Sequence, residues 1–256
     1  CRSEAQAAFG VDGVYVERLM SNARHIEVQV LGDGREVIAL GERECTLQRR
    51  FQKLVEIAPS PSLPQALRER ITRDALRMAA ALRYESLGTF EFLVDPASEA
   101  LPYVFIEANP RLQVEHTITE EVFGVDLVQT QIRLAAGARW ADLGLDPKAP
   151  PAPRGYAMQW RINAETLAAD GSARPAVGTI GAYEPPSGPG LRVDGYGYAG
   201  YRVSPSYDSL LAKVIAWAPT RDEALASLSA ALAGARIHGV TTNRNLLVRV
   251  LRHDEF

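Results

Sequence analysis

Apolar and polar residues alternate with a period of two in a short segment near the start of the chain, residues 24–31. Between residues 24 and 31, the apolar positions Ile26, Val28 and Val30 are interleaved with His25, Glu27 and Gln29. This period is typical of a strand with one buried face, because successive side chains of a strand point to opposite sides. Asp33–Gly34 is a turn signal ahead of an apolar segment at 37–40. The pattern therefore predicts a hairpin with one polar face.

A second pair of apolar segments lies at 89–94 and 103–107, joined by the turn-rich stretch 95–102. These segments predict another antiparallel pair. In such a pair, Glu91 and Glu107 would approach each other across the hairpin.

Four segments have the spacing of helices. An apolar stripe in residues 67–82 predicts an amphipathic helix; it consists of Leu67, Ile71, Ala75, Met78, Ala79 and Leu82. Asp126 is a suitable N-cap for a helix that ends at Gly137. Thr220–Glu223 forms a capping box before a stripe of Ala224, Leu225, Leu228, Leu232 and Ala235. A last helix is expected to hold Leu246, Leu247 and Leu251.

The segment 146–154 contains four prolines and predicts a linker or long surface loop between two folding units. Beyond it, Gly and Pro recur between short segments up to residue 207, which indicates short strands and turns, and 210–217 reads as a buried strand. The chain is therefore expected to be a mixed α+β protein.

Composition excludes several classes. The 256 residues can bury one large core or two smaller ones. A net charge of −3 argues against a general nucleic-acid binder, and no apolar stretch has the length of a membrane span. Cys1 and Cys45 lack metal-ligand spacing, and no secretory leader is visible, so a cytoplasmic location is expected. Because the chain has no initiator Met, it is expected to begin inside a longer polypeptide.

The segment 106–115 carries the densest candidate chemistry. Its polar residues occupy every second position: Glu107, Asn109, Arg111, Gln113 and Glu115. In an extended backbone all five would point to one side. Carboxylate and amide oxygens suit Mg²⁺, an Arg fork suits an oxyanion, and a Glu can act as a base. The alternative is the solvated face of an edge strand, which Pro110 would favour.

Four motifs in order resemble one family. They are 42–53 (ERECTLQRRFQK), 88–92 (GTFEF), 105–116 (FIEANPRLQVEH) and 161–165 (RINAE). Together with 207–209 and 239–243 they closely resemble biotin carboxylase, the ATP-grasp component of biotin-dependent carboxylases. The resemblance implies that residues 1–19 end the ATP-grasp lid, that 20–137 complete the ATP-grasp core, and that 138–256 form the biotin carboxylase C-terminal domain. It covers only the C-terminal part of the enzyme, without a glycine-rich phosphate loop.

This resemblance implies a reaction and its ligands. ATP and bicarbonate would give carboxyphosphate, from which CO₂ passes to biotin on a carrier protein. Mg²⁺ or Mn²⁺ would be held by Glu91, Glu107 and Asn109. The residues implied for the nucleotide are Glu17, Arg18, Met20, His25, Gln48, Glu91 and Glu107.

The resemblance also assigns roles at the reacting groups. Lys53 and Arg111 would bind bicarbonate, helped by Gln113 and the backbone N–H of Val114. Glu115 matches the general base, and Arg161 matches the residue that stabilises the enolate-like oxygen of biotin. Arg18 and Phe51 depart from the family, which often has Lys and His at these positions, so nucleotide affinity is expected to differ.

The expected partners are a biotin carboxyl carrier protein or domain, a carboxyltransferase, and a second copy in a homodimer of the full-length protein. No nucleic-acid or membrane partner is expected. Two alternatives stay open: a carbamoyl-phosphate-synthase-like ligase, or a dimerisation or carrier-docking fragment without catalysis. The chain by itself is expected to be inactive, and the final acceptor of CO₂ is not encoded in it.

Overall fold

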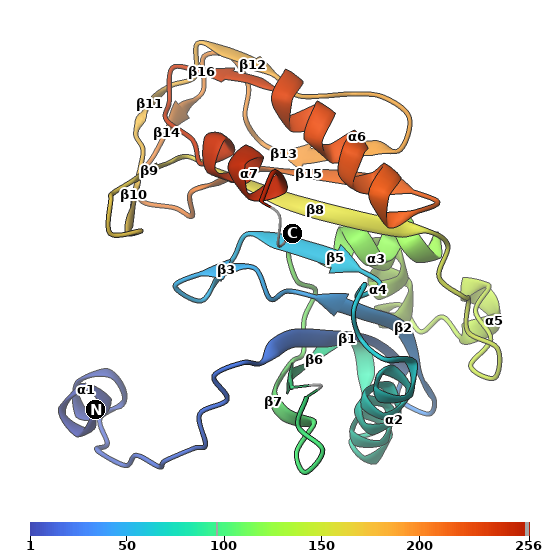
Figure 1. Ribbon diagram of the computed structural model, residues 1–256. Coiled ribbons are helices and arrows are strands. Elements are labelled where there is room, and N and C mark those ends of the chain that lie inside the picture. The colour runs from blue at the N-terminus through green and yellow to red at the C-terminus, as the bar shows by residue number, and fades with distance from the viewer. Residues whose placement is uncertain (96, 254–255) are drawn as a thin grey trace.

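The computed structural model describes residues 1–95, 97–253 and 256, and its main feature is one antiparallel sheet of eight strands (Figure 1). The strand order is β13-β15-β8-β5-β2-β1-β6-β7. These strands are β1 (Arg24–Asp33), β2 (Val37–Glu44), β5 (Val55–Ala58), β6 (Glu85–Val94), β7 (Tyr103–Asn109), β8 (Tyr156–Asn163), β13 (Leu191–Gly195) and β15 (Leu210–Ala218). Because β8 pairs with β5, the regions before and after the proline-rich segment share this sheet.

Shorter strands lie outside the main sheet. They are β3 (Gln48–Arg49), β4 (Gln52–Lys53), β9 (Glu165–Leu167), β10 (Ala173–Pro175), β11 (Gly178–Thr179), β12 (Ala182–Glu184), β14 (Arg202–Val203) and β16 (Arg236–His238). The helices are α1 (Arg2–Phe9), α2 (Gln65–Ala81), α3 (His116–Phe123), α4 (Leu127–Ala135), α5 (Trp140–Leu143), α6 (Arg221–Gly234) and α7 (Arg244–Leu251).

Helices cover both faces of the sheet. On one face, α2 packs on β1 and β6, and α6 and α7 pack on β5, β8 and β15. On the other face, α3 and α4 bury a core that includes Leu31, Leu40, Ile118 and Ile215. Since side chains alternate along each strand, every strand in the centre of the sheet contributes to both cores.

The predicted hairpins and helices are confirmed, with one correction. β1 pairs with β2, and β6 pairs with β7 so that Glu91 lies opposite Glu107. Asp126 caps α4, and Thr220 and Glu223 form the capping box of α6. The assignment of Leu82 to the buried stripe is wrong: α2 ends at Ala81, and Leu82 is 70% exposed because it is the C-cap, where the chain turns away from the helix toward β6.

The N-terminal helix α1 stands apart from this body (Figure 1). α1 contains no buried residue, and residues 11–20 have no helix or strand (Figure 1). Across the part of the chain that the structure describes, every helix is too short or too polar to cross a bilayer.

Candidate active site

The α3-facing side of the sheet carries an unusual set of buried polar side chains. Strand alternation places them on the same face from neighbouring strands: Glu27, Arg43, Glu56, Glu91, Gln159, Arg161 and Lys213. Contacts to α3 fix this orientation, since Arg43 donates to Thr119 Oγ1 and Lys213 donates to Thr117 Oγ1. A face that would otherwise be apolar is thus a preorganised polar surface.

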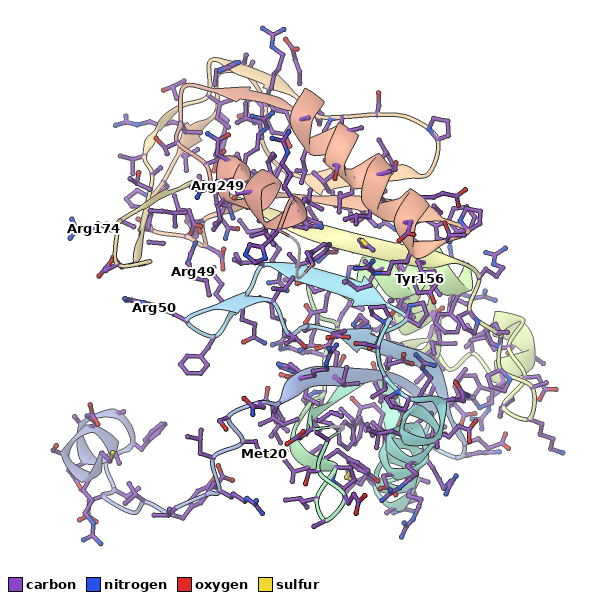
Figure 2. The ribbon with its side chains drawn as sticks, in the orientation of Figure 1. Met20, Arg49, Arg50, Tyr156, Arg174 and Arg249 are labelled. Carbon is purple, nitrogen blue, oxygen red and sulfur yellow. The ribbon has the colours of Figure 1, made fainter. Side chains whose placement is uncertain are left out.

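A cavity of about 830 Å³ opens on this polar surface. It is lined by thirteen of the predicted site residues: Arg18, Met20, His25, Gln48, Lys53, Glu91, Glu107, Asn109, Arg111, Gln113, Val114, Glu115 and Arg161. Glu17 lies outside this lining, exposed in the segment before β1. Figure 2 shows Met20 in that segment, close to the start of β1.

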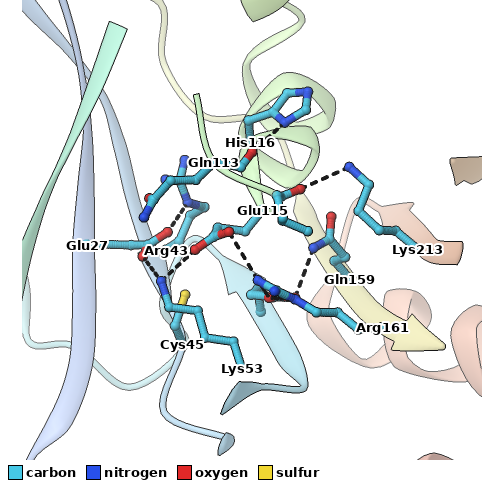
Figure 3. Close-up of polar contacts among 12 residues, drawn as sticks. Glu27, Arg43, Cys45, Lys53, Gln113, Glu115, His116, Gln159, Arg161 and Lys213 are labelled. Carbon is cyan, nitrogen blue, oxygen red and sulfur yellow. Dashed lines mark hydrogen bonds and ion pairs between the residues drawn. The ribbon is translucent and has the colours of Figure 1, made fainter. Parts of the chain in front are cut away.

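Glu115 accepts hydrogen bonds from two cationic side chains of the cavity, Lys53 and Arg161. Its Oε1 accepts a hydrogen bond from Lys53 Nζ at 2.5 Å, and its Oε2 accepts one from Arg161 Nη2 at 3.1 Å (Figure 3). Lys53 also donates to Glu27 Oε2 at 2.5 Å and lies 3.6 Å from Glu91 Oε1. Both cations are therefore held in place by carboxylates on several sides.

These contacts set the protonation of the two carboxylates that face the cavity. Burial acts to raise the pKa of Glu115, but Lys53, Arg43 and Arg161 outweigh burial and lower it to about 2. Burial also opposes ionisation of Glu91, whose pKa is nevertheless lowered to about 2 by a hydrogen bond from His25 and by the charge of Lys53. Both groups are therefore ionised at neutral pH.

Glu91, Glu107 and Asn109 form a second cluster in the lining of the cavity. Asn109 Nδ2 donates to Glu91 Oε1 at 2.9 Å and to Glu107 Oε1 at 2.8 Å. Two carboxylates and an amide are oxygen donors of the kind that Mg²⁺ prefers. At present the Asn109 amide hydrogens lie between the two carboxylates. The three side chains fit a divalent cation once the amide turns so that its Oδ1 faces the ion.

The nucleotide candidates form a short polar chain. His25 Nε2 lies 2.6 Å from Glu91 Oε2, and His25 Nδ1 lies 2.8 Å from Gln48 Nε2. Gln48 begins the β3–β4 hairpin, whose turn residues Arg50 and Phe51 have φ of 47° and 68°. Phe51 lines the cavity and is 98% exposed, whereas Arg49 on the same hairpin pairs with Glu165. Figure 2 shows Arg49 and Arg50 on this hairpin.

The expectation of one extended strand through residue 115 is wrong. β7 ends at Asn109, and Pro110 begins a turn in which Arg111 N–H donates to Asn109 O at 2.8 Å. Pro110 cannot donate to a ladder, so the strand stops there. The alternative interpretation is the solvated face of an edge strand, and β7 is indeed the last strand of the sheet. Despite the turn, the five polar residues still line one cavity.

Sequence reasoning missed three buried charges that support the site. Glu27 accepts from Arg43 Nε at 2.5 Å and from Lys53, and Glu56 accepts from Arg161 Nε at 2.6 Å. The period-two pattern of β1 already placed Glu27 on the polar face. Glu56 and Arg43 lie in short, mixed segments without such a signal.

Comparison with known proteins places the chain in a family. Residues 1–143 match the family described as carbamoyl-phosphate synthase L chain, ATP binding domain, and residues 159–256 match the biotin carboxylase C-terminal domain. The chain is 48% identical to pyruvate carboxylase 1 of Caenorhabditis elegans, covering 99% of the chain and 21% of that protein. It is 44% identical to the biotin carboxylase of Nostoc sp., covering 100% of the chain and 55% of that protein.

A solved structure gives the same result. The biotin carboxylase domain dimer of the Hydrogenobacter thermophilus 2-oxoglutarate carboxylase, in complex with MgADP, ADP and bicarbonate, matches with a TM-score of 0.90 and 42% identity. The match covers 100% of this chain and 55% of that one. The chain thus spans about half the length of these biotin carboxylases. With its ATP-grasp part followed by the C-terminal domain, it belongs to the biotin carboxylase family of ATP-grasp proteins.

Proposed function

We propose that this chain is part of a biotin carboxylase that uses ATP and bicarbonate to carboxylate biotin on a carrier protein, by way of carboxyphosphate. The observation that carries the proposal is the convergence of Lys53 and Arg161 on the ionised Glu115 inside the cavity. Fixed cations can hold the bicarbonate anion close to the negatively charged phosphates of ATP, and the ionised carboxylate can accept the proton that bicarbonate loses. The MgADP and bicarbonate bound by the Hydrogenobacter relative support it.

The first half-reaction uses Lys53, Arg111 and Glu115. Bicarbonate binds between the Lys53 ammonium and the Arg111 fork, with Gln113 and the Val114 N–H as further donors. When bicarbonate shares Lys53, that cation stabilises the Glu115 carboxylate less, so the basicity of Glu115 rises. Glu115 accepts the bicarbonate proton, and the freed oxygen bonds to the terminal phosphorus of ATP as the bond to ADP breaks.

The second half-reaction uses Arg161. Carboxyphosphate splits into CO₂ and phosphate, and the phosphate accepts the proton of the biotin ureido nitrogen. This nitrogen then bonds to the carbon of CO₂. Negative charge develops on the ureido oxygen as the proton leaves, and the Arg161 guanidinium stabilises that charge.

The remaining cavity residues serve the nucleotide and its cation. Glu91, Glu107 and Asn109 would hold Mg²⁺ or Mn²⁺, which would offset the charge of the phosphates. His25 and Gln48, together with Arg18 and Met20, lie where the nucleotide enters. The proposal also includes a carrier protein, a carboxyltransferase and a homodimer as partners.

The test uses a protein of the relatives' full length that carries this chain. Phosphate release from Mg-ATP is measured with and without bicarbonate, and carboxybiotin is measured after addition of free biotin. Bicarbonate-dependent phosphate release with carboxybiotin formation is the expected result. Carbamoyl phosphate formed from ammonia, without carboxybiotin, would instead support the carbamoyl-phosphate-synthase-like alternative.

ATP binding by the 256-residue chain alone addresses the remaining alternative. Titration calorimetry with Mg-ATP, compared with the same titration on Glu91→Gln, reports whether the cavity binds the nucleotide. Binding that depends on Mg²⁺ and on Glu91 supports a working site. If neither this chain nor the full-length protein binds Mg-ATP, a docking fragment without catalysis is the better description.

A further inference from the structure

Glu56 is a buried carboxylate in direct contact with the proposed biotin-stabilising residue. It lies on β5, and its side chain is completely buried. Its Oε1 accepts from Arg161 Nε at 2.6 Å and also contacts Arg161 Nη2. Glu115, which lines the cavity, accepts from the same Nη2 at 3.1 Å (Figure 3). The guanidinium is therefore held between two carboxylates on different elements. Glu56 does not line the cavity itself.

A chain of hydrogen bonds holds Glu56 in turn. Gln159 Nε2 donates to Glu56 Oε2 at 3.0 Å, and Thr117 Oγ1 donates to Gln159 Oε1. Lys213 Nζ donates to Thr117 Oγ1 at 3.2 Å and to the Val114 carbonyl at 2.9 Å. This series of hydrogen bonds thus connects Glu56 through Thr117 of α3 to Val114, which also lines the cavity.

The cost of burying Glu56 makes a merely passive role a poor explanation. Burial raises the pKa of Glu56 to about 7, although the charge of Arg161 acts to lower it. A buried ion pair with such a penalty is weak support for stability, and such pairs are often replaceable by apolar residues. The pair does restrict the conformation of Arg161. Its side chain has four rotatable bonds, and the contact with Glu56 fixes the guanidinium in one orientation toward the cavity.

We propose that Glu56 is a positioning residue that orients the Arg161 guanidinium for the carboxylation of biotin. The inference rests on the proposed function of Arg161. Because Glu56 holds the Nε edge, the terminal nitrogens of Arg161 remain directed toward Glu115 and the cavity. Gln159 positions Glu56 from behind.

The test compares both half-reactions in the full-length protein. Glu56→Gln is expected to lower carboxybiotin formation by about 10-fold to 100-fold, because a small displacement of a positioned charge costs that much in rate. Bicarbonate-dependent ATP cleavage without biotin is expected to stay within about 3-fold of the unsubstituted protein, since Lys53, Arg111 and Glu115 are unchanged. The double variant with Arg161→Ala is expected to be no worse than Arg161→Ala alone.

Two further variants keep the test decisive. Glu42→Gln removes another buried carboxylate that pairs with an arginine, Arg68 of α2 on the opposite face of the sheet, and is expected to retain both activities. If Glu56→Gln lowers the melting temperature too far for assay, Gln159→Met is used instead. It removes the hydrogen bonds of Gln159 to Glu56 and to Thr117, leaves Glu56 and Arg161 in place, and is expected to show the same selective loss. Equal loss in both assays, additive loss in the double variant, or full carboxylation activity would overturn the inference. Absence of carboxybiotin formation in the unsubstituted protein would instead overturn the proposed function.

Discussion

At the scale of single residues, the charged groups of the cavity differ in how firmly they are held. Arg161 and Lys53 each pair with at least two buried carboxylates, whereas Glu107 is exposed and is contacted by Asn109. Substitution of either cation therefore disturbs its partners as well as the reaction. Substitution of Glu107 is therefore expected to affect mainly the cation that we propose it binds.

We expect Glu107→Gln to reduce Mg-ATP cleavage in the full-length protein by about 100-fold or more while leaving the fold intact, because a dication loses one anionic ligand. Phosphate release at several Mg²⁺ concentrations measures the effect, and the melting temperature reports on the fold. Glu36→Gln, at the exposed turn between β1 and β2, is the matched control. Unchanged cleavage in Glu107→Gln would remove Glu107 from the cation site.

Arg161→Ala separates the half-reactions. Loss of one preorganised charge donor is expected to lower carboxybiotin formation by about 100-fold, with a much smaller effect on bicarbonate-dependent ATP cleavage. Arg111→Ala should slow ATP cleavage as well, because it removes the anion fork from bicarbonate. Parallel assays of phosphate release and carboxybiotin measure both steps. If Arg161→Ala slows both steps equally, Arg161 supports the whole site and not the biotin step.

At the scale of elements, α6 shows how a local sequence signal stabilises the region beyond the proline-rich segment. Thr220 Oγ1 accepts from the Glu223 N–H at 3.3 Å, and Glu223 Oε2 accepts from the Thr220 N–H at 3.2 Å. Thr220→Ala is expected to lower the free energy of unfolding by about 1 kcal/mol, because an orphan N–H of the helix loses its acceptor. Urea unfolding measures this loss. Thr220→Ser keeps the capping hydroxyl, so its free energy of unfolding should stay close to that of the unsubstituted protein. A loss in Thr220→Ser as large as in Thr220→Ala would show that packing of the threonine methyl group, and not the cap, is responsible.

At the scale of the whole molecule, the buried ionic network makes stability depend on pH. The pKa of Glu91 is about 2 in the folded protein and about 4.5 when unfolded. Its contribution to stability is therefore present above pH 4.5 and is lost as pH falls toward 2, by roughly 3 kcal/mol at most. We expect the free energy of unfolding to drop across this window, and to drop less in Glu91→Gln. Identical pH profiles of the two proteins would contradict this assignment.

The sequence by itself determined the local helices and strands, and it identified most of the residues that line the cavity. Periodicity identified the strands around Glu91 and Glu107 and the helices α2, α4 and α6, because these signals depend only on neighbours along the chain. Family-like motifs identified the residues that line the cavity.

Only the tertiary structure decided how these residues are held. Glu27, Glu56 and Arg43 become part of the site because strands far apart in the sequence are adjacent in one sheet, and no local pattern encodes that adjacency. The turn at Pro110 likewise replaced the expected strand, since a residue without an N–H cannot continue the ladder. The pKa values of Glu56 and Glu115 move in opposite directions because burial and paired charge are properties of the folded sheet.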